Sequence, residues 1–282
     1  MRPTYHRTSL IILLLTGIGM QTVRAETIDC TAITSLPYTI ATQGIYCLTG
    51  NLSTSIGSGS AIDIQTNNVT LDLNGYKLGG LGAGDGTQAN GIVAFSRKNI
   101  TIKNGIVRGF NVGIFLNAPP PYTSSSGHVV KGILADQNTS VGIQVVGVGN
   151  TVSNDTVVDT GGSTVTNTAI GIRVVGSGAK LAANTISTTS AKSTATAYGI
   201  YLNTANYSLV QNNTVTDTAS ESGSSFAIYV DNSTGVFLRN NNLANAGAGL
   251  VFGASSGKYF NNLTFDVTTP FVGGTAIGSN ND

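Results

Sequence analysis

The sequence predicts an all-β solenoid of about eight or nine stacked coils, and three observations carry this prediction. The chain holds 36 Gly among 282 residues, and only 10% of its residues are charged, which disfavours helical bundles and coiled coils. A step of Gly or Ala followed by a hydrophobic residue recurs every 22 to 30 residues. Each step opens a short run in which hydrophobic residues alternate with others, as is typical of a β-strand.

The first predicted strand of each repeat begins at one of these steps. The steps are Ala61-Ile62, Gly91-Ile92, Gly113-Ile114, Gly142-Ile143, Gly171-Ile172, Gly199-Ile200, Ala227-Ile228 and Gly249-Leu250. The pair Ala276-Ile277 is a candidate for a ninth step. The repeats therefore run through most of the chain.

Two further short strands are expected in each repeat, because a pair of apolar residues five positions apart follows each first strand. These pairs run from Leu73 and Leu78 in the first repeat to Phe260 and Phe265 in the last, and Asn is frequent between them. Three short strands cannot bury their apolar faces alone. Stacking the coils about 4.8 Å apart buries one continuous core, and Asn suits the corners because it tolerates left-handed backbone and can bond to the next coil.

The predicted domain order is a signal peptide over 1–25, an N-terminal cap over 26–60 and the β-helix over 61–282. A basic start precedes the apolar run Leu10–Leu15, and Val23-Arg24-Ala25 fits a cleavage site; the run is too short for a retained anchor. Cleavage would leave 11 basic and 13 acidic residues, a net charge of −2. This charge offers no electrostatic case for nucleic acid. With no second apolar run of membrane length, we expect a secreted or periplasmic protein.

The two cysteines, Cys30 and Cys47, are expected to form a disulfide. Two cysteines 17 positions apart in an exported chain most simply pair with each other. The bridge would hold the predicted cap over the first coil.

The candidate site lies on the outward positions of the first strands, because alternate residues of a strand point to opposite faces. One outward row carries Gln144, Arg173, Tyr201 and Tyr229, and a neighbouring row adds Asn203 and Asp231. Arginine binds carboxylates in a bidentate manner and aromatic rings suit the apolar faces of sugars. These residues therefore predict a groove for an acidic polysaccharide. The alternative interpretation is that Arg173 simply stacks on Tyr201 and the tyrosines cover the sheet.

Acidic residues in the loops before these strands give a weaker signal. Asp85, Asp159, Asp217 and Glu221 lie in the loop ranges 79–90, 158–170 and 216–226. Clustered carboxylates are what Ca²⁺ requires, so calcium is a possible cofactor, although solvated loop acids are the simpler interpretation. No other metal or cofactor is expected. His128, the only histidine after residue 25, is expected to be structural because it has no evident catalytic partner.

The coil pattern G-I-x-V … V-x-x-N-x-I resembles the right-handed parallel β-helix of the pectin lyase-like superfamily. The stretches LPYTIATQGIYCLTGNL (36–52) and AIDIQTNNVTLDLNGYKLGG (61–80) are similar to the entry segment of secreted bacterial β-helix repeat proteins. The resemblance covers about residues 28–280 and implies a single right-handed parallel β-helix. The superfamily includes pectate and pectin lyases, polygalacturonases, alginate epimerases, phage tailspikes and inert repeat proteins. The catalytic motifs of polygalacturonases, alginate epimerases and pectate lyases are missing here, so no catalytic residue carries over.

Two functional hypotheses follow. In the first, the protein is directed at carbohydrate and binds or cleaves an acidic polysaccharide or cell-surface glycan. A lyase-like reaction would use Arg173 as the catalytic residue, to neutralise a uronate or to act as base. In the second, the protein is a non-catalytic structural, surface or adhesion module. Whether it is an enzyme stays open at the level of the sequence.

Overall fold

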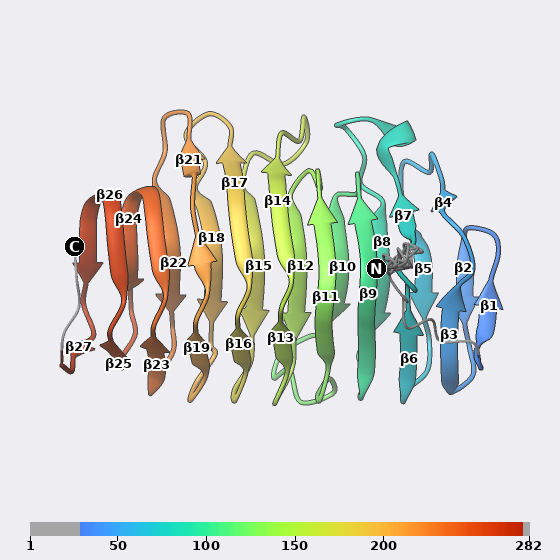
Figure 1. Cartoon of the computed structure of the whole chain (residues 1–282), viewed down its shortest axis with the longest axis horizontal. Coiled ribbons are helices and arrows are strands. Elements are labelled where there is room, and N and C mark those ends of the chain that lie inside the picture. Colours follow the sequence, from blue (N-terminus) through green and yellow to red (C-terminus); the bar gives the residue numbers. More distant parts are fainter. Residues whose placement is uncertain (1–28, 279–282) are drawn as a thin grey trace, which may run out of the picture.

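The computed structural model describes residues 29–278 and shows one stack of short parallel strands with hardly any helix (Figure 1). A single 3-10 turn, η1 (Leu81–Ala83), is the only helical element in that range. All the strands belong to one sheet that winds around the core, and every pairing is parallel. The predicted all-β solenoid is confirmed. The predicted signal peptide lies outside the described residues.

Three columns of strands run the length of the stack, and the chain visits them in turn. The first column contains β2 (Tyr38–Ile40), β5 (Ser60–Ile64), β8 (Asn90–Phe95), β10 (Val112–Asn117), β12 (Val141–Val146), β15 (Ala169–Val175), β18 (Ala197–Asn203), β22 (Ser225–Asp231) and the C-terminal parts of β24 (Asn242–Phe252) and β26 (Leu263–Val272).

The second column contains β1 (Thr31–Ile33), β3 (Gly44–Leu48), β6 (Val69–Asp72), the N-terminal parts of β9 (Ile100–Arg108) and β11 (Val129–Asp136), β13 (Thr151–Ser153), β16 (Lys180–Ala182), β19 (Leu209–Gln211), β23 (Val236–Arg239), β25 (Gly257–Phe260) and β27 (Thr275–Ala276). The third contains β4 (Leu52–Ser53), β7 (Lys77–Gly79), the C-terminal parts of β9 and β11, β14 (Thr156–Gly161), β17 (Thr185–Ala191), β20 (Thr214–Val215), β21 (Thr218–Ser220) and the N-terminal parts of β24 and β26.

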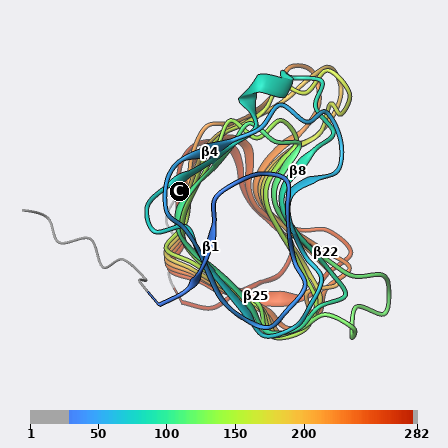
Figure 2. The same ribbon diagram turned by 90° about the vertical axis from the view of Figure 1, so that its right-hand side faces the viewer.

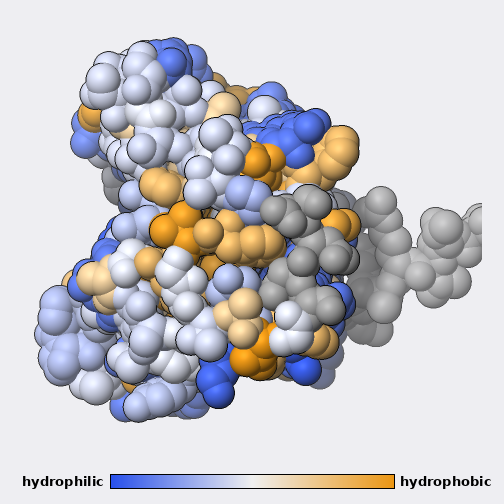
Figure 3. All heavy atoms as spheres, turned by 90° about the vertical axis from the view of Figure 1, so that its left-hand side faces the viewer, coloured by the Kyte–Doolittle hydropathy of each residue, from blue (hydrophilic) through white to orange (hydrophobic). Residues whose placement is uncertain are grey.

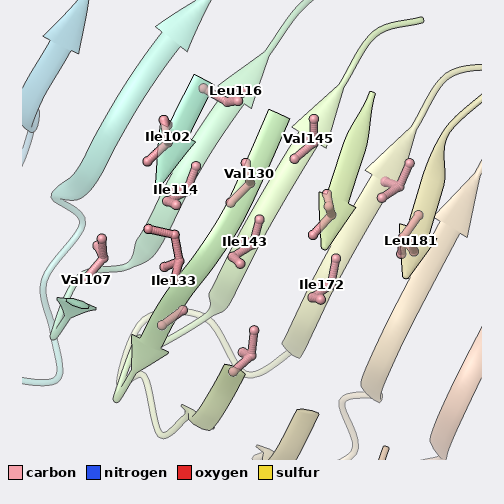
Figure 4. Packing of buried hydrophobic residues seen from close by; sticks show 14 of the residues in the cluster. Ile102, Val107, Ile114, Leu116, Val130, Ile133, Ile143, Val145, Ile172 and Leu181 are labelled. Atoms are coloured by element: carbon pink, nitrogen blue, oxygen red, sulfur yellow. The ribbon is translucent and has the colours of Figure 1, made fainter. Parts of the chain in front are cut away.

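The core is built from stacked aliphatic residues of equivalent positions in successive coils. Ile114, Ile143 and Ile172 pair across β10, β12 and β15 and are completely buried (Figure 4). The residues that follow them, Phe115, Gln144 and Arg173, lie on the opposite face of the strands, which gives the first column an inner and an outer face. The same alternation fixes which residues of this column are available to a ligand.

The ends of the stack differ from the predicted repeat in three places. The step at Ala276 does not open a first-column strand, because Ala276 pairs with Tyr259 in the second column. The tenth and last first-column strand is part of β26, where Phe271 pairs with Leu250. At the other end, the segment predicted as a cap already contains the strands β1 to β4, each of which pairs with a strand of the next coil.

The second and third columns also correct the register of the predicted apolar pairs at both ends. Leu71, not Leu73, pairs with Ile102. Tyr259 and Thr264 continue the inward positions of the last coil, so Phe260 and Phe265, the last of the predicted apolar pairs, point outward and are 39% and 69% exposed. A shift of one residue moves a side chain to the opposite face of a strand.

The described residues contain no helix with the length and apolarity of a membrane span.

Candidate functional site

The predicted outward row on the first column is present in register. Gln144 of β12 pairs with Arg173 of β15, which pairs with Tyr201 of β18, which pairs with Tyr229 of β22. Asn203 pairs with Asp231 two residues further along β18 and β22. The six predicted residues thus come from four successive coils, and the sheet itself sets their spacing at about 4.8 Å per coil.

Arg173 has no acidic partner within residues 29–278. Its Nη1 donates to the side-chain oxygen of Gln144 at 3.4 Å, and its Cζ lies 5.8 Å from the ring centre of Tyr201. Its Nε is buried without a hydrogen-bond partner. The contact with Tyr201 agrees with the alternative interpretation, in which Arg173 simply stacks on this ring. The guanidinium nevertheless keeps N–H donors that a ligand could use.

A polar network occupies the next two coils. Asp231 Oδ2 accepts hydrogen bonds from Tyr201 Oη at 3.2 Å, Asn203 Nδ2 at 3.1 Å and Asn232 Nδ2 at 3.0 Å. Burial, and then the nearby Asp231 carboxylate, raises the pKa of Tyr201 to about 12. Tyr201 therefore stays protonated near neutral pH and is a donor rather than a base.

Two aromatic residues that the sequence analysis did not assign to the site complete an aromatic cluster. Tyr198 stacks on Tyr201 with ring centres 4.7 Å apart, and Phe226 lies 4.8 Å from Tyr229. Strict alternation would place Tyr198 and Tyr201, three positions apart, on opposite faces. Gly199 breaks the alternation: like the next residue, Ile200, it faces the core, where a Cβ at position 199 would collide with the side chain of Val215, and the tyrosines on either side of this pair both face outward.

The concave part of this face lies on the N-terminal side of Arg173. A groove of about 510 Å³ extends from Arg173 and Gln144 past Phe115 and Phe95. Figure 2, viewed along the stack, shows the first-column face between loops projecting at one edge and the loop after β10 at the other. That second loop closes the groove with residues of Ala118–Tyr122. No pattern in the sequence marks the proline-rich loop after β10 as a wall of this groove.

Carboxylates are far apart on the strands of this face. Among residues 29–278, the first-column strands carry two acidic residues, Asp63 and Asp231. Six coils separate them, which corresponds to about 29 Å. Hydrolysis of a glycosidic bond by paired carboxylates needs separations of about 5 to 10 Å. These two residues cannot act as such a pair.

The loop acids do not assemble into a metal site in the described part of the chain, where no three His, Cys, Asp or Glu side chains gather. Asp217 Oδ1 accepts a hydrogen bond from Asn245 Nδ2 at 2.8 Å. Glu221 Oε2 accepts one from the backbone N–H of Ser193 at 2.6 Å. Both acids therefore have local partners that connect neighbouring coils.

His128 lies inside the stack rather than in the groove. It is 1% exposed, and burial lowers its pKa to about 4. The backbone N–H of Ile100 donates to Nδ1 at 3.3 Å, and Nε2 lies 2.7 Å from Ser125 Oγ. A neutral imidazole with its proton on Nε2 satisfies both contacts, which gives His128 a structural role.

Comparison with solved structures places this arrangement among known folds. The Dettilon tailspike protein superposes with a TM-score of 0.60 at 15% identity, covering 89% of this chain and 54% of that one. Tailspike protein 2 of bacteriophage CBA120 superposes with a TM-score of 0.62 at 15% identity over 86% of this chain. The chain has a parallel β-helix fold. It covers 54% of the first tailspike and 42% of the second, so it spans about half of their length or less.

The pectate lyase Pel9A has the same fold, with a TM-score of 0.50 at 14% identity, covering 86% of this chain and 71% of that one. No family model and no curated protein matches the chain. At these identities the likeness concerns the fold alone. The function of this β-helix has to be argued from its own groove.

Proposed function

We propose that this β-helix is an exported, carbohydrate-directed protein that binds an acidic polysaccharide along the exposed face of its first strand column. The observation that carries the proposal is Arg173, a cation at the end of a 510 Å³ groove that has no acidic partner among residues 29–278. Its guanidinium can hold a sugar carboxylate by two hydrogen bonds. Phe95 and Phe115 offer apolar surface to the neighbouring sugar.

Binding is better supported than cleavage. The two carboxylates on the first-column strands are too far apart to act as a pair on one bond, and Tyr201, with a pKa of about 12, is a poor base for a lyase reaction. A catalytic role for Arg173 remains a prediction, and a search for unsaturated products or new reducing ends from pectate, alginate and glycosaminoglycans tests it directly. A calcium requirement is tested by running the same reactions with and without the ion.

Export is supported by the Cys30–Cys47 disulfide, because such bridges persist in oxidising compartments. A glycan outside the cytoplasm is then the partner that the protein would meet. The polysaccharides and cell-surface glycans of that compartment are the natural ligands to screen.

The binding proposal is tested by replacing Arg173 with alanine. We expect affinity for acidic oligosaccharides to fall by about 1.5–3 kcal/mol, the usual range for hydrogen bonds to charged groups, while affinity for neutral oligosaccharides changes little. Isothermal titration calorimetry provides the measurement. Stability should change by no more than about 0.5 kcal/mol, as for most surface substitutions.

Arg239 provides a matched control. Like Arg173, it donates to a glutamine of the preceding coil, here Gln211, and its Cζ lies 6.0 Å from an aromatic ring centre, that of Phe237. It belongs to the second column, away from the groove. Arg239→Ala should leave binding intact; equal losses in both variants would contradict a site at Arg173. Binding that survives in both variants would place the site elsewhere, whereas no binding by the parent protein would favour the structural-module hypothesis, in which the Arg173–Tyr201 contact only covers the sheet.

A further inference from the structure

The proposed groove contains a single positive charge. Of the residues that line the 510 Å³ groove, only Arg173 is charged, and it lies at one end. Toward the N-terminal coils the lining is apolar and aromatic, with Phe95, Phe115 and Tyr122 as its largest side chains. Phe95 is 52% exposed, so part of its ring is free to contact a sugar.

The opposite direction, toward the C-terminal coils, ends in a negative charge. Asp231 lies two coils along the stack and two residues along the strand from the position of Arg173, which corresponds to about 12 Å. Its Oδ2 is occupied by three donors, whereas Oδ1 has no partner among the described residues. Asp231 can therefore accept hydroxyl groups of a neutral sugar but repels a carboxylate.

A sugar in an extended chain is about as long as the spacing of one coil, so the sugars one and two positions from one held at Arg173 lie over these two regions. A second carboxylate on the N-terminal side would lose its hydration against apolar side chains. A second carboxylate on the C-terminal side would face Asp231. The groove thus accepts one anionic sugar and disfavours another on either side of it.

We infer that the ligand is an acidic heteropolysaccharide in which anionic sugars are separated by at least two neutral sugars, rather than a homopolymer of uronates. The inference rests on the proposed binding function and specifies its substrate class. The neutral sugar on the N-terminal side packs its apolar face or an acyl group against Phe95 and Phe115. The neutral sugar on the C-terminal side donates hydroxyls to Asp231.

The test compares two oligosaccharides of equal length by calorimetry at low salt. One is an oligogalacturonate, which carries a carboxylate on every sugar; the other is a gellan oligomer without acyl groups, in which one glucuronate is followed by three neutral sugars. We expect the sparsely charged oligomer to bind at least tenfold more tightly. Equal or tighter binding of oligogalacturonate overturns the inference.

Two variants test the cause of the preference. Asp231→Asn removes the negative charge on one side, and Phe95→Lys adds a positive charge on the other. Each should reduce the preference for the sparsely charged oligomer by about fivefold, the size expected for one added or removed charge interaction near a protein surface. Phe265→Lys, at a 69% exposed phenylalanine outside the groove, is the control for a general charge effect. If it shifts the preference as much as Phe95→Lys, the inference is wrong.

The failure of the inference is distinct from the failure of the proposed function. Tight binding of both acidic oligomers, lost in Arg173→Ala, would retain the acidic-glycan site and refute the charge spacing. Absence of binding to either acidic oligomer, or binding that survives Arg173→Ala, would refute the site itself and with it the inference.

Discussion

Four asparagines occupy the same buried corner in successive coils, and an aspartate continues their line. Asn184, Asn213, Asn241 and Asn262 are each at most 1% exposed. The Oδ1 of each accepts the backbone N–H of the coil before it at 3.0–3.1 Å, and its Nδ2 donates to a backbone carbonyl of that coil. This repeated bonding satisfies the polar groups that the corner buries.

Asp155 occupies the next position of this ladder. Its Oδ1 accepts the backbone N–H of Ile133 at 2.8 Å, as an asparagine would, but Oδ2 is buried without a hydrogen-bond partner. In the asparagines of this ladder the second side-chain atom is Nδ2, a hydrogen-bond donor, so an ionised Oδ2 of Asp155 would lie where the ladder places a donor. Burial accordingly raises the pKa of Asp155 to about 7, in spite of lowering by its backbone hydrogen bonds.

The aspartate makes stability depend on pH. In the unfolded chain its pKa is about 3.8, so its contribution to stability is complete below pH 4 and declines as pH rises through 7. A rise from 3.8 to about 7 corresponds to about 4 kcal/mol. Asp155→Asn, which restores a donor and removes the titration, should make the protein more stable than the parent at pH 8 and flatten the decline between pH 4 and 8. Urea unfolding across this range measures the effect.

Asp159→Asn is the control for this substitution. Asp159 lies on the same strand, β14, is exposed, and has a left-handed backbone that asparagine tolerates. Charged side chains on the strands around Asp155 are Lys131, Asp136, Asp159 and Lys180; none of them contributes to the raised pKa of Asp155. A pH profile that Asp159→Asn flattens equally would show that a general charge effect, not burial, is responsible.

At the scale of elements, the disulfide joins the segment before β1 to β3. Cys30 and Cys47 are bonded with their Cα atoms 5.9 Å apart, as the sequence predicts. In the chain-entropy model a loop of this size contributes on the order of 3 kcal/mol. Thiol labelling of the exported protein in denaturant should detect no free cysteine without reductant and two after reduction, with a lower unfolding midpoint in the reduced protein. Two thiols in the unreduced protein would refute the bridge.

The elements also show how far sequence patterns reach. The step of Gly or Ala followed by a hydrophobic residue located eight first-column strands, because a small buried residue followed by a larger buried one is a local requirement. The same step hid Tyr198, since two consecutive core-facing positions, Gly199 and Ile200, interrupt the period of two from which the outward residues were predicted. The wall at Ala118–Tyr122 depends on how far a loop extends beside neighbouring coils, which no local pattern records. Taking Phe260 and Phe265 as the apolar pair of the last repeat was wrong in register by one residue, because hydrophobicity alone cannot fix the register of a strand at an end of the stack.

For the whole molecule, the two ends of the stack are unequal. At the N-terminal end the first strands are short, and the disulfide ties them together. At the C-terminal end the ten-residue strand β26 pairs on one side with β24 within the described residues, and hydrophobic residues gather in the middle of this end (Figure 3). Leu263, Phe265 and Val272 are 46%, 69% and 39% exposed.

This asymmetry predicts where the stack opens first. In a solenoid each coil is stabilised mainly by its two neighbours, so a terminal coil lacks one interface. We expect amide hydrogen exchange, followed by mass spectrometry, to be slowest in β12, β15 and β18 and fastest at the C-terminal end. Peptides covering Leu263–Val272 should exchange roughly 30-fold faster than those covering Ala169–Val175, the equivalent of about 2 kcal/mol less protection. Reducing the disulfide should accelerate exchange in β1 to β4 and leave β26 unchanged. Uniform protection from β5 to β26 would instead mean that the stack unfolds as one cooperative unit, without opening from an end.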